Sequence, residues 1–512
     1  MPVFVIRRLV VSVFILLVSS FLIFILVAHS GDPLGDLRTD TSPNRDQKIE
    51  HRIEKLHLDQ SDPQRYVTWL GGASKCLVPG LGCDLGQSVR DQDVTVLLSQ
   101  ALSATLQLVT AAILLSMVLG VSVGVVSALR QYSGFDYTIT FSAFLFFSLP
   151  VFWVAVLLKQ YLAIEANDWY SDPRIGITAT ALLSVVSGLF WGALLGGNRR
   201  RRWTVRVVAA LATGGVLQYL SAVEWFRRPS LGPGLIALLS FGAAVGFAAL
   251  LAGLHRRNIL YACLTTAALG SVIQFPATSW IEDRTWASWL NIGLLALSAV
   301  AVAVAVGFAF GGLDRGPAIR ACVLTALFSG LFMISDILLR TVPSYSKKVN
   351  GRVLATTGAE TPDLHGTFWQ NQVDQITHLI LPTLAIMLIS FATYSRYSRA
   401  TMLDVMNQDY VRTARAKGLT ERTVVVRHAF RNALIPLTTL AAVDLGVIVG
   451  GAVITETVFA RRGMGSLFVT ALNQVDPNPV MGFYIVTAVS IVLFNMLADI
   501  AYAYLDPRIR LT

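Results

Sequence analysis

The chain has 512 residues, of which 54% are hydrophobic and only 14% are charged, with a formal net charge of +10. Soluble globular proteins carry about 25% charged residues, so this balance excludes that class and indicates an integral membrane protein. The positive charge does not require a nucleic-acid partner, because the cytoplasmic loops of membrane proteins collect Lys and Arg.

The first predicted element is a membrane span at 9–28. About twenty apolar residues follow a short basic region here, which is enough helix to cross a hydrocarbon layer of roughly 30 Å. A secretory signal has a shorter apolar core and a small-residue cleavage site, so we expect this span to be retained. Arg7 and Arg8 place the N-terminus in the cytoplasm.

A polar loop at 30–95 follows and contains Cys76 and Cys83 in "SKCLVPGLGCDLG". With the N-terminus inside, this loop lies outside, where disulfides persist. A Cys76–Cys83 disulfide and two unpaired thiols are both open at this point. No His or second Cys pair stands nearby, so zinc is not expected.

The remaining apolar stretches bring the number of predicted spans to about twelve. They lie near 100–128, 137–163, 175–196, 204–222, 232–254, 259–277, 288–311, 319–340, 377–398, 435–457 and 481–505.

The basic residues of the short loops favour an orientation with both termini in the cytoplasm. Alternate loops carry the positive charge, and two loops dissent, one with Arg227 and Arg228 and one with Lys347 and Lys348. The residues on the cytoplasmic side are Arg7, Arg8, Arg130, Arg199 to Arg202, Arg256, Arg257, Arg315, Arg320, the stretch 409–436, Arg508 and Arg510.

The middle of the chain shows an internal similarity. "LLGGNRRRRWTVRVVAALATGGVLQ" resembles "LLAGLHRRNILYACLTTAALGSVIQ" and, more loosely, "AFGGLDRGPAIRACVLTALFSGLFM". The pattern predicts three tandem helical hairpins over 175–340, as in transporters built from repeats. Chance likeness between basic turns of Gly- and Ala-rich helices is the alternative.

The stretch "DYVRTARAKGLTERTVVVRHAFRNALIP" at 409–436 is basic although spans flank it. We expect a short helix ended by Gly418 and a second helix capped by Thr420, with Val426, Phe430, Ala433 and Leu434 on its apolar face. Pro436 favours a bend where the next span begins. Docking on another protein and contact with anionic lipid headgroups both fit this pattern.

Charged residues in the apolar segments are expensive to bury and often functional. Lys159, Asp336 and Glu456 lie near predicted span ends, from which they can reach water. Asp444 and Asp499 are candidates for a water-filled substrate pathway, and polar packing between helices is the other interpretation.

The basic stretch resembles the "EAA" loop of ABC importer permeases, in the form of the B-type subunits of the oligopeptide/dipeptide permease family. "DYVRTARAKGL" and "RHAFRNALIP" carry this resemblance, with "GGAVITETVFARRGMGSLFVTAL" at 450–472 and "YAYLDPRIR" at 502–510. "IRRLVVSVFILLVSSFLIFILVAHSGDP" and "LSATLQLVTAAILLSMVLGVSVGVVSAL" are similar to the start of these proteins.

The resemblance implies an all-α polytopic membrane protein, a type I ABC importer permease core of six helices with an inserted block of about six more. Residues 1–173 would form the first part of the core, 174–374 the insert with an extracytoplasmic loop, and 375–512 the rest of the core with a coupling loop at 399–434.

The resemblance also implies site residues, partners and location. ATPase coupling would rest on Asp409, Tyr410, Val411, Arg412, Thr413, Ala414, Arg415, Ala416, Lys417 and Gly418, and the second loop helix would contribute Arg427, His428, Arg431, Asn432 and Pro436. The partners would be a second homologous permease, two ATPase domains holding ATP and Mg, an extracytoplasmic solute-binding protein, a peptide and membrane lipid. The location would be the cytoplasmic membrane of a prokaryote.

The chain itself is expected to have no catalytic residue, metal or cofactor. It contains no HExxH, no Gly-x-Ser-x-Gly, no Walker A pattern and no histidine cluster. The alternatives are an ABC permease for nickel or another small solute, and a secondary transporter driven by an ion gradient, which would use intramembrane carboxylates.

Overall fold

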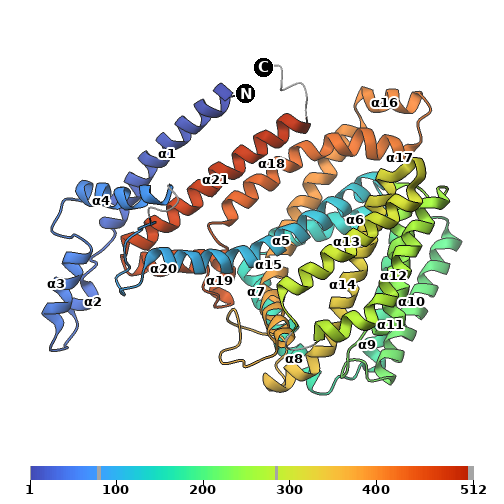
Figure 1. Ribbon diagram of the computed structural model, residues 1–512, viewed down its shortest axis with the longest axis horizontal. Helices are drawn as coiled ribbons and strands as arrows, with labels where there is room; N and C mark the ends of the chain where they lie inside the picture. Colours follow the sequence, from blue (N-terminus) through green and yellow to red (C-terminus); the bar gives the residue numbers. More distant parts are fainter. Residues whose placement is uncertain (1, 78–81, 283–285, 506–512) are drawn as a thin grey trace. The chain divides into compact units, whose positions relative to one another are not determined.

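The computed structural model describes residues 2–77, 82–282 and 286–505, which are predominantly helical (Figure 1). Two compact units divide the chain: unit 1 comprises 1–160, 356–359 and 379–512, and unit 2 comprises 161–355 and 360–378. The only β pairing in the described part is an isolated bridge between Gln87 and Asp93. The all-helical class predicted from the sequence is confirmed, whereas the boundaries predicted for an insert at 174–374 stay a prediction.

Unit 1 contains the first helices of the chain and most of the last ones. Its elements are α1 (Pro2–Ala28), α2 (Gly35–Arg38), α3 (Arg45–Lys55), α4 (Asp62–Ser74), η1 (Lys75–Leu77), α5 (Val94–Leu129), α6 (Gly134–Ser148), α7 (Val151–Leu157), the start of η2 (Leu158–Ile164), most of α15 (Phe368–Met406), α16 (Asp409–Ala416), α17 (Glu421–Thr423), η4 (Val424–Phe430), α18 (Arg431–Ile448), α19 (Val453–Val458), α20 (Met464–Asn473) and α21 (Pro477–Leu505).

The long helix α5 organises the packing of unit 1. Its N-cap residue Asp93 accepts a hydrogen bond of 2.7 Å from the Thr95 N–H, which satisfies one of the free donors of the first turn. Further along, a Cβ added at Gly120 would lie 2.7 Å from the Cβ of Tyr394, and one at Gly124 only 2.5 Å from the Ser395 carbonyl oxygen. Glycine therefore allows α5 and α15 to pack backbone against backbone, as small residues do between membrane helices.

A buried ion pair joins the start of α6 to α15. The Arg399 guanidinium donates to the Asp136 carboxylate from Nε at 2.7 Å and from Nη2 at 3.0 Å. The Asp136 side chain is only 4% exposed and also accepts from the Ser127 hydroxyl at 2.5 Å. This geometry is the bidentate arrangement in which Arg–carboxylate contacts are strongest.

Replacing Arg399 with Met should therefore destabilise the protein by about 3–5 kcal/mol, because it leaves the Asp136 carboxylate buried without its countercharge. The thermal unfolding midpoint of purified protein in detergent measures this loss. Adding Asp136→Asn to the variant removes the unpaired charge and should restore part of the midpoint; a double variant no more stable than Arg399→Met alone would contradict the explanation.

The third predicted span, 137–163, is not one straight helix. Between the two apolar segments, α6 and 151–171, the helix direction changes by 104°. Leu149 is extended, with φ −82° and ψ 128°, because the ring of Pro150 disfavours a helical conformation in the residue before it. The prediction of a continuous span missed this break.

The number of spans agrees closely with the expected twelve. Over the described residues, nine stretches are long and apolar enough to cross a membrane, or up to ten if the bent pair is one span. One of the nine, 289–348, holds two of the predicted spans, so that at 435–457 is the predicted span without a counterpart in this set. Helix α18 ends at Ile448, and the chain then turns through Gly451, which has φ +91°.

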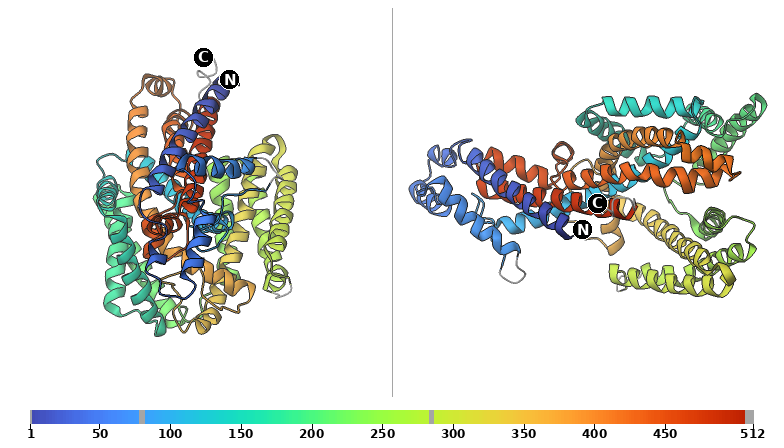
Figure 2. Two further views of the ribbon diagram at one scale, coloured as in Figure 1. Left: turned by 90° about the vertical axis from the view of Figure 1, so that its left-hand side faces the viewer. Right: turned by 90° about the horizontal axis from the view of Figure 1, so that it is seen from above.

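Unit 2 contains α8 (Glu165–Ser171), α9 (Ile177–Leu195), α10 (Arg199–Ala222), α11 (Gly232–Leu251), α12 (Arg257–Glu282), α13 (Trp289–Gly311), η3 (Gly312–Asp314) and α14 (Arg315–Lys348). The predicted hairpins are present as the packed pairs α9–α10, α11–α12 and α13–α14, and the first pair is easily followed in Figure 2. Their turns contain Gly197, Gly253 and Gly312, all with positive φ. Glycine adopts this conformation without the Cβ clash that other residues suffer.

The second and third hairpins share a core of small side chains. Cys263 and Cys322 are fully buried in it beside Ala262 and Ala321 and pack as small apolar residues. Outside this core, Asp374 accepts hydrogen bonds from the Tyr345 hydroxyl at 2.8 Å and from the backbone and side chain of Thr361. Through these hydrogen bonds, Asp374 links Tyr345 of α14 and Thr361 of the loop 349–367 to the first turns of α15.

Candidate functional site

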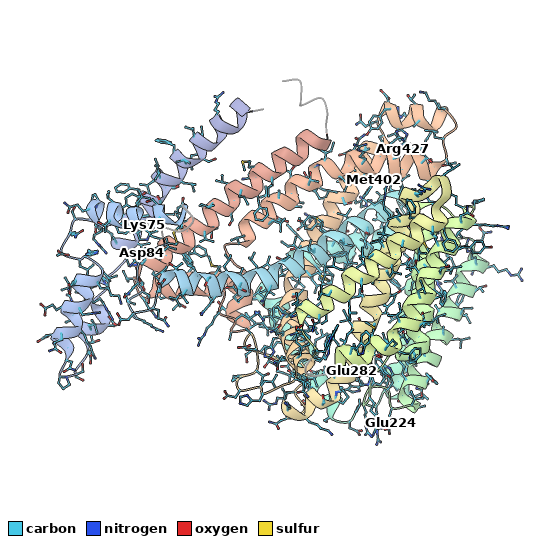
Figure 3. All side chains as sticks on the ribbon, in the orientation of Figure 1. Lys75, Asp84, Glu224, Glu282, Met402 and Arg427 are labelled. Carbon is cyan, nitrogen blue, oxygen red and sulfur yellow. A yellow bond between two sulfur atoms is a disulfide. The ribbon has the colours of Figure 1, made fainter. Side chains whose placement is uncertain are left out.

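The basic stretch at 409–436 forms a compact loop between α15 and α18 at one end of unit 1. Figure 3 shows Arg427 and Met402 at this end, close to α16. On α16, Val411 and Ala414 are buried and pack with Val424. The opposite face exposes Asp409, Tyr410, Arg412, Thr413, Arg415, Ala416 and Lys417. The Ala414 side chain therefore faces the chain's own core and does not contribute to the exposed face of α16.

Gly418 ends α16 as the sequence predicted. Its φ of +74° is the left-handed conformation, and its N–H donates to the Arg415 carbonyl at 2.9 Å. A Cβ at this position would meet no atom within 4 Å. Glycine is thus required here by backbone conformation and not by lack of space.

The second helix begins where the sequence predicted it. Thr420 is its N-cap and accepts a hydrogen bond from the Thr423 N–H at 3.4 Å. Arg415 donates to both carboxylate oxygens of Glu421, at 2.8 and 3.2 Å, and so ties α16 to α17. The Arg415 hydrogen bond lowers the pKa of the Glu421 carboxyl.

The predicted apolar face of the second helix is only partly correct. Ala433 is buried as expected, but Phe430 and Leu434 are half-buried and Val426 is 58% exposed. Residues 424–430 form a π-helix, and the fully buried positions are Val424, Ala429, Ala433 and Leu437. A π turn places residues five apart on the same face and shifts the helical phase by one residue. The residue types of 424–430 suit an α-helix as well as a π-helix, so the sequence does not reveal this shift.

Of the other residues predicted for the second helix, some face solvent and one contacts α16. Arg427 and Arg431 are exposed, and His428 is partly exposed. Asn432 donates a hydrogen bond of 2.9 Å to the Tyr410 hydroxyl, which links the start of α18 to α16. Pro436 lies inside α18 and does not mark the beginning of a separate helix.

A hollow of about 650 Å³ lies beside this loop. Its walls come from the ends of α5 and α15 and from α17 and η4, and they include Leu129, Leu403, Met406 and Val425. Arg415 and Glu421 stand at the same hollow. A depression with both apolar and charged walls can serve as a contact surface for another protein.

Of the two intramembrane aspartates, Asp444 and Asp499, the structure describes the side chain of Asp444 alone. Asp444 is partly buried and accepts a hydrogen bond of 2.8 Å from the Tyr394 hydroxyl, which joins α18 to α15. Asp499 lies on α21, and its side chain is outside the described part of the structure. The role of both residues in a pathway stays a prediction.

Glu456 does not reach water, contrary to expectation. It is 1% exposed, and its oxygens accept hydrogen bonds from the Thr105 hydroxyl at 2.8 Å and the Ser466 N–H at 2.9 Å. Asp336 is also buried and accepts from the backbone N–H groups of Leu231 and Gly232. Lys159 contacts the Val458 carbonyl oxygen at 3.5 Å.

Two buried charges near α20 escaped the sequence reasoning. Arg461 is 2% exposed and Asp476 is 1% exposed, although both occur in short polar segments that are typical of loops. Asp476 accepts a hydrogen bond of 2.7 Å from the Val89 N–H. Burial raises the pKa of the Asp476 carboxyl to about 6.

The raised pKa of Asp476 predicts that this residue weakens the fold at neutral pH. The folded protein holds a proton that the unfolded chain has lost between about pH 4 and 6, so stability falls as the pH rises through this window. Asp476→Asn should stabilise the protein by roughly 2–3 kcal/mol at pH 7.5 and make little difference at pH 4. Thermal unfolding midpoints at both pH values measure this.

Asp59→Asn, at an exposed position, serves as the matched control and should leave the midpoint unchanged. Equal effects of Asp476→Asn at pH 4 and pH 7.5 would contradict the assignment.

Cys76 and Cys83 form a disulfide in the structure. In the described ranges, no group of three or more His, Cys, Asp or Glu side chains is placed to hold a metal ion. The loop at 409–436 is therefore the largest concentration of predicted site residues that the structure assembles.

Residues 318–511 match the family model described as "Binding-protein-dependent transport system inner membrane component". The family resemblance found in the sequence is confirmed over this range, which contains the whole 409–436 loop. The match begins at Ala318, inside the block predicted as an insert. With the apolar helices, it identifies a multi-pass inner-membrane protein.

Curated relatives carry peptide-transport names. The chain is 38% identical over 189 residues to the oligopeptide transport system permease protein OppB of Mycobacterium tuberculosis, which is 37% of this chain and 58% of that protein. It is 44% identical over 154 residues to the oligopeptide transport system permease protein AppB of Bacillus subtilis, 30% of this chain and 48% of that one. Against the dipeptide transport system permease protein DppB of Escherichia coli, identity is 41% over 140 residues, 27% of this chain and 41% of the relative. The chain thus spans about half the length of the curated relatives it matches.

Proposed function

We propose, from the membership of residues 318–511 in the family of binding-protein-dependent transport system inner membrane components, that the chain is the transmembrane permease subunit of an ABC importer. Its substrate class is peptides, in line with the names of its relatives. The chain would form the translocation path and hydrolyse no ATP itself.

The loop at 409–436 supports this proposal more than any other feature. Helix α16 stands on a small core of Val411, Ala414 and Val424, and the Arg415–Glu421 contact fixes it to α17. A partner that pushes on the exposed face of α16 would therefore move α15 and α18 together. Such a rigid connection would let closure of an ATPase move the membrane helices.

The proposed partners follow from this role. Two ATPase domains would hold the ATP and Mg, and one of them would dock at α16 and α17 of this chain. A second homologous permease would complete the path, and an extracytoplasmic solute-binding protein would deliver the peptide. This chain would carry no catalytic residue and no cofactor.

The proposed orientation places both termini and the coupling loop in the cytoplasm. Figure 1 shows the beginning of α1, the end of α21 and helix α16 at the same end of unit 1. The disulfide between Cys76 and Cys83 belongs to the loop that this orientation puts outside, in the compartment where disulfides persist. We further propose that the hairpins of unit 2 are an insertion into the six-helix core.

The first test of the proposed function is ATP hydrolysis by the reconstituted complex of this chain with its second permease and ATPase subunits. Binding protein loaded with a mixed di- to pentapeptide pool should stimulate hydrolysis several-fold over empty binding protein. No stimulation of an assembled, ATP-binding complex would point to nickel or another small solute. Failure of the ATPase to co-purify would favour a transporter driven by an ion gradient.

The second test is Gly418→Asp. The substitution forces a residue with a Cβ into the left-handed conformation, at a cost of about 1–2 kcal/mol, and reshapes the end of α16. Peptide uptake should fall at least roughly tenfold while the protein still inserts and the ATPase still hydrolyses ATP.

Gly351→Asp is the matched control. Gly351 has φ +80° and equally open surroundings but lies far from α16 in the sequence, in the loop after α14, so uptake should be unchanged. Normal uptake by Gly418→Asp would rule out the coupling assignment.

A further inference from the structure

The turn of the first hairpin of unit 2 carries the longest run of basic residues in the sequence. Arg199 to Arg202 are consecutive and begin α10, and Arg206 follows one helical turn after them. The chain contains no Asp or Glu between Pro173 and Val223, a range that includes the whole hairpin. The hairpin therefore carries five positive charges, all from arginine, and no negative charge of its own.

The run is open to the outside of the protein and has almost no partner within it. Arg199, Arg200, Arg201 and Arg202 are all exposed. Among the described residues, the one side-chain hydrogen bond of the run joins Arg202 Nε to the Gly197 carbonyl oxygen at 3.1 Å. Helix α10 has no acidic residue in its first turn, and the helix dipole disfavours positive charge at this end. These arginines therefore do not stabilise the helix that they begin.

The turns of the other two hairpins contain arginines that have partners inside unit 2. Arg256, in the turn between α11 and α12, forms an ion pair with Asp314. Arg315, at the start of α14, has its guanidinium carbon 4.2 Å from the centroid of the Phe308 ring, which is a cation–π contact. The first turn has more arginines and no carboxylate for them, so its charge is available to a ligand from outside the chain.

Arg206 adds a donor from within the hairpin. Its stem crosses α9 at Gly192, where a Cβ would lie only 2.5 Å from the Arg206 Cγ. Its guanidinium carbon is 5.6 Å from the centroid of the Trp203 ring, and its Nε has no acceptor among the described residues. Because Trp203 is one turn closer to the start of α10, the charged end of Arg206 is directed toward the run. Long basic side chains in apolar spans reach the membrane boundary in this way.

The arginine cluster, residues 199–202 and 206, stands at a membrane boundary. Helices α9 and α10 are each long and apolar enough to cross a membrane. Trp191 and Trp203 are exposed, and each lies four residues from its helix end at the turn, Leu195 or Arg199, or roughly 6 Å along the axis. Tryptophan is enriched at this depth, where apolar chains meet headgroups.

The hairpin is also accessible from the surrounding membrane. Helix α10 has no buried residue, and it packs mainly against α9. Apolar side chains such as Leu182, Val208 and Leu211 are exposed on the two helices. Lipid can therefore lie along the hairpin and bring its headgroup to the exposed arginines without any opening of the protein.

The chemistry of the cluster selects the headgroup. A guanidinium stays charged at any physiological pH and binds a phosphate group through two parallel hydrogen bonds. Clusters of basic residues beside a span attract anionic lipid. We propose that the arginine cluster binds the phosphate groups of anionic phospholipids whose acyl chains lie against α9 and α10. This inference does not depend on the importer assignment, since it requires only that the chain lies in a membrane.

The test is native mass spectrometry of the full-length chain in detergent, mixed with equal amounts of phosphatidylglycerol and phosphatidylcholine that have the same acyl chains. The wild type should retain several-fold more phosphatidylglycerol than phosphatidylcholine. Arg199→Gln/Arg200→Gln should lower this excess at least roughly threefold, because two of the five charges are lost. Arg201, Arg202 and Arg206 remain and still favour the original orientation of the hairpin.

Arg256→Gln/Arg257→Gln is the matched control. It removes the same charge from the turn of the second hairpin, where Arg256 already has Asp314 as a partner, and should leave the excess of phosphatidylglycerol nearly unchanged. An equal loss in the two double variants would overturn the proposal, because binding would then follow the net charge of the chain and not this cluster.

Two measurements on the wild type are independent of how any variant folds. Raising NaCl from about 50 mM to about 500 mM should reduce the excess of phosphatidylglycerol several-fold, because salt screens exposed charges. An excess that salt does not change would overturn the proposal.

The second measurement compares inorganic phosphate with chloride at equal ionic strength. The two salts should displace similar amounts of phosphatidylglycerol. Much stronger displacement by phosphate would identify the free anion as the ligand and would overturn the lipid assignment. A wild type that retains both lipids equally would also overturn it and would leave an acidic protein surface as the partner of the cluster.

Discussion

Hydrocarbon offers no hydrogen-bond partner, and this constraint governs the whole chain. Every backbone N–H and C=O group at membrane depth must be satisfied within the protein, so the apolar stretches become helices. Side-chain caps, turns and charged groups are therefore concentrated at the helix ends. Asp93 caps α5, Gly418 ends α16, and the chain turns at Gly451 only where the backbone of Gly465 is close.

The helix ends of unit 1 handle charge in two different ways. Around α16 the charged side chains are mostly exposed and stand on a small apolar core, an arrangement that suits contact with a large partner. Around α20 the side chains of Glu456, Arg461 and Asp476 are buried, and the glycines at 451 and 463 leave room for the Glu456 carboxylate. Exposed charge can be exchanged for contacts at little cost, whereas buried charge is expensive unless hydrogen bonds within the protein compensate it.

The three hairpins of unit 2 share the same simple features of sequence. Each of its turns contains a glycine with positive φ beside basic residues, and small side chains such as Ala262 and Ala321 let two of the helix pairs pack closely. An even number of helices returns the chain to the side from which it left. A block of this kind can therefore be added to a membrane protein without inverting the helices that come after it.

The sequence by itself determined the helical class, the hairpin turns, the cap at Thr420 and the end of α16 at Gly418. These features depend on hydropathy and on the conformational preferences of single residues, which are local properties. Only the tertiary structure decided the phase shift of the π-helix at 424–430, the end of α18 at Ile448 and the burial of Glu456 and Arg461. Those outcomes depend on contacts such as Thr105 with Glu456, which join residues 351 positions apart, and no local pattern encodes the environment that such contacts create.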